Sequence, residues 1–304
     1  MLVVIVVVVV GLVTGVAGGF AAHRWPRAVA PRVDAASVGR EVAAHPAVGK
    51  AARSLEPAPA TAVALGLSVT AVVAALVGVG ALLAMVETGS GLARWDLSAA
   101  RFGASHASEG STTVLRWVSQ MGGTRGALLL ALVAVLVARR TGRPRVRATQ
   151  AMAFAVLVVG GQFLLSNAAK LLVDRPRPDL LNLTGFSGTS FPSGHATAAA
   201  ATLAVAALLL ARGRSRRAQA VLFGAAAGLA AMVAATRVLL GVHWLTDVLA
   251  GLLLGWGWFG LCSVAVGGRL LRFGAPAEQA AAAADAAEAD TGVDTDRAAA
   301  PSPP

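Results

Sequence analysis

Seven long apolar runs dominate this sequence and restrict what the chain can fold into. They lie at roughly residues 2–22, 61–86, 117–138, 150–172, 196–211, 220–236 and 245–266. About 20 apolar residues suffice for a helix to cross the hydrocarbon core of a bilayer. Hydrophobic residues make up 56% of the 304 residues, more than soluble domains usually contain. The sequence therefore predicts an all-α protein, a polytopic transmembrane helical bundle.

Basic residues are concentrated between the apolar runs. The net charge of the chain is +11, and arginines are concentrated in two short segments, "RRTGRPRVR" (139–147) and "RGRSRR" (212–217). Such clusters in short loops mark the cytoplasmic side of a membrane protein, so this charge pattern does not indicate a nucleic-acid partner. The basic segment 23–60 fits the same side. The amino terminus is then expected outside.

The chain divides into four predicted parts. Residues 1–22 form an amino-terminal transmembrane anchor; a cleaved signal peptide is the alternative, but the basic flank follows the apolar run instead of preceding it. Residues 23–60 form a cytoplasmic basic linker and 61–274 the membrane core. Residues 275–304, rich in alanine, acids and proline, form a disordered cytoplasmic tail. The single cysteine, Cys262, excludes an intramolecular disulfide.

Three segments bring ionisable residues to one predicted membrane face, the outer one. They are "NAAKLLVDRPRP" (167–178), "FPSGH" (191–195) and "TRVLLGVHWLTD" (236–247). A charged side chain near the centre of a membrane helix costs about 3 kcal/mol on insertion scales, so such residues usually serve a function. Each residue alone has an ordinary explanation; Lys170 at a helix end, for example, is typical of a snorkelling anchor.

Together, the charges at this face predict an anion site. Several cations meeting at one shallow site repel one another unless an anion lies between them, and phosphate matches lysine and arginine donors. Ser193 is expected to cap the helix that follows, whose first backbone N–H groups point at the same place. His243 and Asp247, four residues apart, are expected on one helix face within hydrogen-bonding reach.

Two histidines beside a phosphate indicate catalysis. His243, oriented by Asp247, can act as a nucleophile, and His195 can give a proton to the leaving oxygen. The acids are not clustered as a two-metal site requires, so we expect neither a metal nor another cofactor.

The same segments resemble the signature of the type 2 phosphatidic acid phosphatase superfamily. Its motif KxxxxxxRP is matched by "KLLVDRPRP", its motif PSGH by residues 192–195, and its motif SRxxxxxHxxxD by "TRVLLGVHWLTD". The resemblance covers about residues 117–266. It implies a six-helix phosphatase core, to which the first apolar run adds an extra helix, with a phosphohistidine on His243 and His195 as general acid. It also implies phosphate binding by Lys170, Arg177, Ser193, Gly194, Arg237 and Thr236, although Thr236 replaces the usual serine.

The predicted function is hydrolysis of a lipid phosphomonoester or pyrophosphate at the extracytoplasmic face of a bacterial plasma membrane. Phosphatidate, phosphatidylglycerol phosphate and a polyprenyl pyrophosphate such as undecaprenyl pyrophosphate are the candidate substrates. The alternative is a transporter or binding protein that holds a phosphorylated molecule without cleaving it. The oligomeric state stays open. In the outer loop 87–116, "LARWDLSAARF" places Leu92, Trp95, Ala99 and Phe102 near one stripe, with Asp96 at its edge. This pattern predicts either an interfacial helix or two interfacial aromatic residues in a loop.

Overall fold

The fold is a bundle of long helices, as the apolar runs predicted. The structure is a computed structural model that describes residues 1–29, 59–141, 148–180, 188–212, 214–263 and 265. Its elements are α1 (Leu2–Val29), α4 (Pro59–Thr88), η1 (Gly91–Trp95), α5 (Asp96–Ser105), α6 (Glu109–Gln120), α7 (Thr124–Thr141), α8 (Ala148–Leu172), α9 (Gly194–Ala211), α10 (Arg216–Leu239) and α11 (Leu245–Cys262). Most of the predicted basic linker and the whole predicted tail lie outside the described residues.

Six of these helices are long and apolar enough to cross a membrane. The spans are Leu2–His23, Val69–Thr88, Ala148–Leu172, Gly194–Ala211, Arg216–Leu239 and Leu245–Cys262. A seventh crossing is made only if α6 and α7 are counted together, because the two helices meet at an angle of 53°. The apolar run at 117–138 is therefore divided between the end of α6 and most of α7.

Glycines permit the bend between α6 and α7. A Cβ atom added at Gly122 would lie 2.5 Å from the carbonyl oxygen of His195, and one at Gly126 would lie 1.9 Å from that of Gln120. Real Cβ atoms do not approach backbone oxygens this closely, so only glycine fits at these two positions. The bend brings the α6–α7 junction against the first turn of α9.

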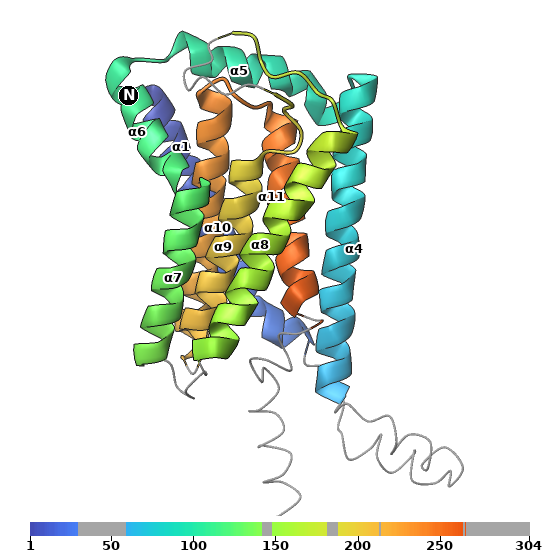
Figure 1. Cartoon of the computed structure of the whole chain (residues 1–304), viewed down its shortest axis with the longest axis vertical. Helices are drawn as coiled ribbons and strands as arrows, with labels where there is room; N and C mark the ends of the chain where they lie inside the picture. The colour runs from blue at the N-terminus through green and yellow to red at the C-terminus, as the bar shows by residue number, and fades with distance from the viewer. Residues whose placement is uncertain (30–58, 142–147, 181–187, 213, 264, 266–304) are drawn as a thin grey trace, which may run out of the picture.

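Helix α9 lies at the centre of the bundle and contacts α7, α8, α10 and α11 (Figure 1). Within its span, 72% of the residues are buried. The sequence GHATAAAATLAVAALLLA explains this position, because a helix that is apolar on all sides is buried and its alanines allow close packing. Helix α5 crosses one end of the bundle, and the carboxyl-terminal ends of α7 and α9 lie at the opposite end (Figure 1).

Helix α1 packs along α10. Gly11, Gly15 and Gly19 face Gly224 and Gly228 so closely that a Cβ at either α10 glycine would lie 2.4–2.5 Å from an α1 carbonyl oxygen. Small residues allow such close contact between membrane helices. The first turns of α1 also reach the site end, where Val3 and Val7 join a buried cluster with Leu239, Leu240 and Val242.

The outer segment predicted as an interfacial helix or a loop is helical, as η1 and α5. Its stripe is divided, because Trp95 is 64% exposed whereas Ala99 and Phe102 pack against the bundle. Asp96, at the edge of the stripe, is turned inward and is only 4% exposed.

Candidate phosphate-binding active site

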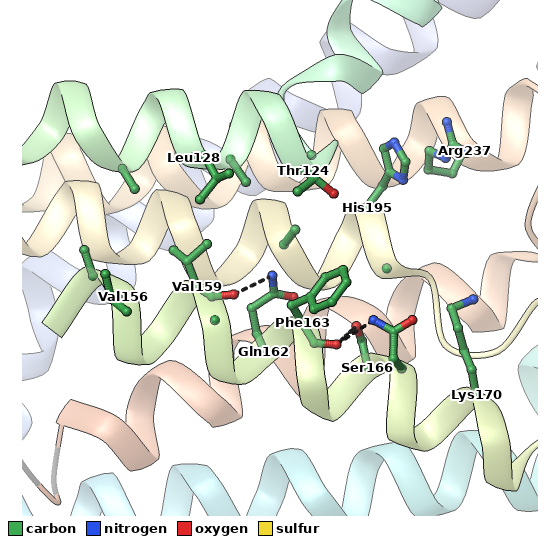
Figure 2. Close-up of a pocket in the computed structure, with 18 of the residues that line it drawn as sticks. Thr124, Leu128, Val156, Val159, Gln162, Phe163, Ser166, Lys170, His195 and Arg237 are labelled. Carbon is green, nitrogen blue, oxygen red and sulfur yellow. Dashed lines mark hydrogen bonds between the residues drawn. The ribbon is translucent and has the colours of Figure 1, made fainter. Parts of the chain in front are cut away.

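The three motif segments meet at the α5 end of the bundle. A cavity of about 660 Å³ begins there and extends between α7, α8 and α9 (Figure 2). Six of the nine predicted site residues line it: Lys170, Arg177, Gly194, His195, Arg237 and His243. The structure thus brings together the two histidines and the three cations that the sequence placed at one face.

Lys170 and Arg177 hold the loop that precedes α9. Lys170, in the last turn of α8, donates from Nζ to the carbonyl oxygen of Thr189 at 2.9 Å. Arg177 donates to the carbonyl oxygens of Gly188 (3.0 Å), Thr189 (3.2 Å) and Val242 (2.7 Å). These contacts fix both cations at the cavity mouth and tie the 188–189 loop to the segment before α11.

Arg237 is a buried cation from the last turn of α10, with a side chain only 2% exposed. Its Nη1 donates at 2.7 Å to Oγ of Ser119, which lies in the last turn of α6, just before the bend. Figure 2 shows Arg237 beside His195 at one end of the cavity. Ser119 belongs to no motif, so this contact could not be predicted from the sequence.

His195 lies in the first turn of α9, beneath the α6–α7 bend. A Cβ added at Gly123 would lie 3.5 Å from His195 Nε2, so the glycine backbone forms one wall around the imidazole. Ser193 occupies the N-cap position, but its hydroxyl makes no capping hydrogen bond, contrary to the prediction. Ser193 Oγ is buried and has no hydrogen-bond partner within the described residues. A buried hydroxyl in this state is suited to bind a ligand oxygen.

His243 and Asp247 are in contact, but not on one helix face as predicted. His243 precedes α11, which begins at Leu245. Its Nδ1 lies 3.4 Å from Asp247 Oδ2, a contact longer than a usual hydrogen bond. The same carboxylate oxygen accepts from the Ser190 hydroxyl and from the backbone N–H of Trp244, the latter at 2.9 Å. Asp247 therefore caps α11 and orients the loop that carries His243.

Burial keeps the His243 imidazole neutral. It lowers the pKa of His243 from 6.5 to about 4, and the neighbouring Asp247 carboxylate offsets only part of this effect. Arg177 Nη1 lies 3.2 Å from His243 Nε2, on the side of the ring opposite Asp247. A neutral ring with Nδ1 toward a carboxylate has its lone pair on Nε2, which accepts from Arg177 Nη1.

A buried ion-pair network, which was not predicted from the sequence, supports the loop that carries His243. Arg175 donates from Nη1 to Asp247 Oδ1 at 2.5 Å and from Nη2 to Asp96 Oδ2 at 2.7 Å. Asp96 also accepts from the backbone N–H of Thr246 at 2.8 Å. The only indication of this network in the sequence is Asp96, an acidic residue at the edge of the apolar stripe in 87–116. Its partners are 79 and 150 residues further along the chain.

Thr236 is buried but does not line the cavity. Its hydroxyl donates to the carbonyl oxygen of Val233 at 2.6 Å, within α10. This places the Thr236 hydroxyl in the helix packing behind Arg237 and not at the position that a phosphate would occupy.

Comparisons with known proteins place these residues in a family. Residues 148–270 match the PAP2 superfamily. Over 123 residues, the chain is 41% identical to a lipid A 1-phosphatase from Rhizobium etli, covering 37% of this chain and 48% of that protein. Over 102 residues, it is 38% identical to phosphatidylglycerophosphatase B from Bacillus subtilis, covering 33% and 50%. The chain spans about half the length of these curated relatives.

The fold has a solved counterpart as well. The crystal structure of a transmembrane PAP2-type phosphatidylglycerolphosphate phosphatase from Bacillus subtilis superposes with a TM-score of 0.56 at 26% identity, covering 63% of this chain and 94% of that chain. The matched segment, the three motifs in order and this shared fold show that residues 148–270 form a PAP2 superfamily domain.

Proposed function

We propose that this protein is an integral membrane phosphatase that hydrolyses a phosphomonoester or pyrophosphate of a lipid through a phosphohistidine intermediate. One observation carries the proposal: His243 lines a cavity whose wall also contains Lys170, Arg177, His195 and Arg237. A nucleophile, a second imidazole and three cations around one space match the needs of phosphoryl transfer.

The cations supply the phosphate site. Lys170, Arg177 and Arg237 surround the end of the cavity from three different elements, so their charges converge on a common anion. The unpartnered Ser193 hydroxyl and the backbone N–H groups of the first turn of α9, beginning at Gly194, add hydrogen-bond donors. Together these groups would stabilise the negative charge on the transferring phosphoryl oxygens.

The histidines divide the chemistry. His243 Nε2 attacks phosphorus, so a P–N bond forms as the P–O bond to the lipid breaks, and Asp247 stabilises the positive imidazole that results. His195, which a bound phosphate would favour in its protonated form, gives its proton to the lipid oxygen. The neutral His195 then takes a proton from water, which attacks phosphorus and releases inorganic phosphate together with neutral His243.

A lipid substrate is supported by the composition of the cavity. Below the cations its walls are largely apolar and include Leu128, Leu132, Val156 and Val159. The named activities of the relatives, lipid A 1-phosphatase and phosphatidylglycerophosphatase, are both lipid phosphatases. We therefore retain phosphatidate, phosphatidylglycerol phosphate and polyprenyl pyrophosphate as candidates and add the 1-phosphate of lipid A.

The proposed orientation puts the site on the extracytoplasmic face of a bacterial plasma membrane. Its support is the charge pattern. Arg139 and Arg140 lie in the last turn of α7, and Arg214 and Arg216 precede or begin α10. These helix ends lie at the end of the bundle opposite α5 (Figure 1). Basic loops favour the cytoplasm, which leaves the cavity mouth outside.

The test is phosphate release by the purified protein in detergent, with a chelator present, across these four lipid phosphates. His243→Ala is the control because it removes the proposed nucleophile. We expect inorganic phosphate from at least one lipid with the native protein and none with the variant. Binding of a lipid phosphate without any release would favour the binding or transport alternative.

A further inference from the structure

One polar side chain stands in the apolar part of the cavity, well below the cations. Gln162 projects from α8 into the space lined by Val159, Phe163 and Leu128 (Figure 2). Its side chain is buried, with only 4% of the residue exposed. The phosphoryl chemistry described above gives this residue no role.

The Gln162 amide is only half satisfied. Its Nε2 donates to the carbonyl oxygen of Val159 at 3.1 Å. This contact sets the orientation of the amide, because exchanging its two ends would place one carbonyl oxygen against another. Gln162 Oε1 is then left without a hydrogen-bond partner among the described residues. A buried acceptor in this state is costly unless something in the cavity donates to it.

The depth of this acceptor follows from α8 geometry. Gln162, Ser166 and Lys170 are spaced four residues apart, all line the cavity and therefore share one helix face. Eight residues separate Gln162 from Lys170, and at 1.5 Å per residue this places it about 12 Å along the helix from the phosphate site. A lipid phosphate bound by Lys170 would place the start of an acyl chain, not its head group, near Gln162.

We propose that Gln162 Oε1 accepts a hydrogen bond from a hydroxyl or amide N–H at the start of a lipid acyl chain. This inference rests on the proposed phosphatase function and narrows its substrate class. The enzyme would favour lipid phosphates with hydroxylated or amide-linked chains over fully esterified lipids with plain chains, which have no donor at this depth.

The test compares three synthetic substrates that share one phosphate head. They are a phosphatidate with plain ester-linked chains, the same lipid with 3-hydroxyacyl chains, and an analogue with an amide-linked chain. We expect kcat/KM of the native protein to be about tenfold higher for at least one donor-bearing lipid, the effect of one hydrogen bond to a buried acceptor. This preference needs no variant to be measured.

Gln162→Met keeps the length of the side chain and removes the amide acceptor. It should abolish the preference by lowering kcat/KM for the donor-bearing lipid about tenfold while leaving the plain phosphatidate unchanged. Gln219→Met is the matched control, because its amide also donates to a backbone carbonyl oxygen (Arg214, 3.0 Å) but the residue lies in the first turn of α10 and does not line the cavity. The control should keep the preference.

The outcomes separate the two proposals. No phosphate release from any lipid would contradict the proposed function. Release from all three lipids at equal kcat/KM would leave the function standing and overturn the role of Gln162, as would an equal effect of Gln162→Met on all three. In that case water is the donor to Oε1.

Discussion

The main chain of Gly122 lies directly against that of His195, and a Cβ atom added at Gly122 would be 2.5 Å from the His195 carbonyl oxygen. The contact joins the α6–α7 bend to the first turn of α9, so the position of the proposed general acid depends on a glycine in the turn between two other helices. Arg237, in α10, also contacts this region, because it donates a hydrogen bond to Ser119 in the last turn of α6. The bend is therefore part of the site.

Gly122→Ala should lower kcat/KM about 100-fold. The added methyl group displaces the first turn of α9, and a displacement of about 1 Å is enough for a loss of this size. Gly110→Ala, in α6, is the control, because nothing lies within 4 Å of its added Cβ. Native activity in the Gly122→Ala protein would show that the bend does not position His195.

Arg175→Ala should destabilise the protein by about 3 kcal/mol. The substitution leaves the carboxylates of Asp96 and Asp247, which are 5% and 0% exposed, without their shared cation. The measurement is the midpoint of thermal unfolding in detergent. Arg94→Ala removes an exposed arginine from the same end of the bundle and should leave the midpoint unchanged. Equal midpoints for the two variants would mean that the network adds nothing to stability.

His243 should make the protein less stable in mild acid. Its pKa is about 4 in the folded protein and 6.5 in the unfolded chain, so the unfolded chain binds more protons between these values. Stability therefore falls as the pH falls from about 6.5 to 4. His243→Asn, which cannot titrate, should show a smaller drop in melting temperature over this range. Parallel curves for the two proteins would contradict a buried neutral imidazole.

Gly15→Val should loosen α1 and reduce activity several-fold. A Cβ at position 15 already lies 3.2 Å from the Gly224 carbonyl oxygen, and the two further methyl groups of valine would force the helices apart. The effect should reach the site because Val3 and Val7 pack against Leu240 and Val242, between Arg237 and His243. Gly80→Val, where an added Cβ meets nothing within 4 Å, is the control. If both variants keep native activity and melting temperature, α1 serves only as an anchor.

The orientation can be tested with single cysteines, because Cys262 is the only native thiol and is buried. In a Cys262→Ala background, Ser105→Cys lies at the site end and Ser215→Cys beside the basic loop; both positions are exposed. In intact cells a membrane-impermeant maleimide should label position 105 and not 215, with both labelled after lysis. The reverse pattern would place the site in the cytoplasm.

The sequence determined the helical membrane fold and the main site residues. Runs of apolar residues long enough to cross a bilayer have few alternatives, because the backbone must satisfy its own hydrogen bonds there. Alternating crossings then bring Lys170, Arg177, His195, Arg237 and His243 to one end, and the order of the three motifs identified them. The cavity that all five line confirms that they meet. Their chemical roles stay predictions.

Only the tertiary structure decided which buried polar groups are partners. Arg175 pairs with Asp96 and Asp247. Arg237 donates to Ser119, and the Thr236 hydroxyl donates to a carbonyl oxygen of its own helix. No local sequence pattern predicts these contacts. Each depends on helix ends far apart in the sequence being placed within about 3 Å, where a hydrogen bond becomes possible. The bend at Gly122 and the packing of α1 on α10 have the same origin, since a glycine is required only where another backbone approaches it.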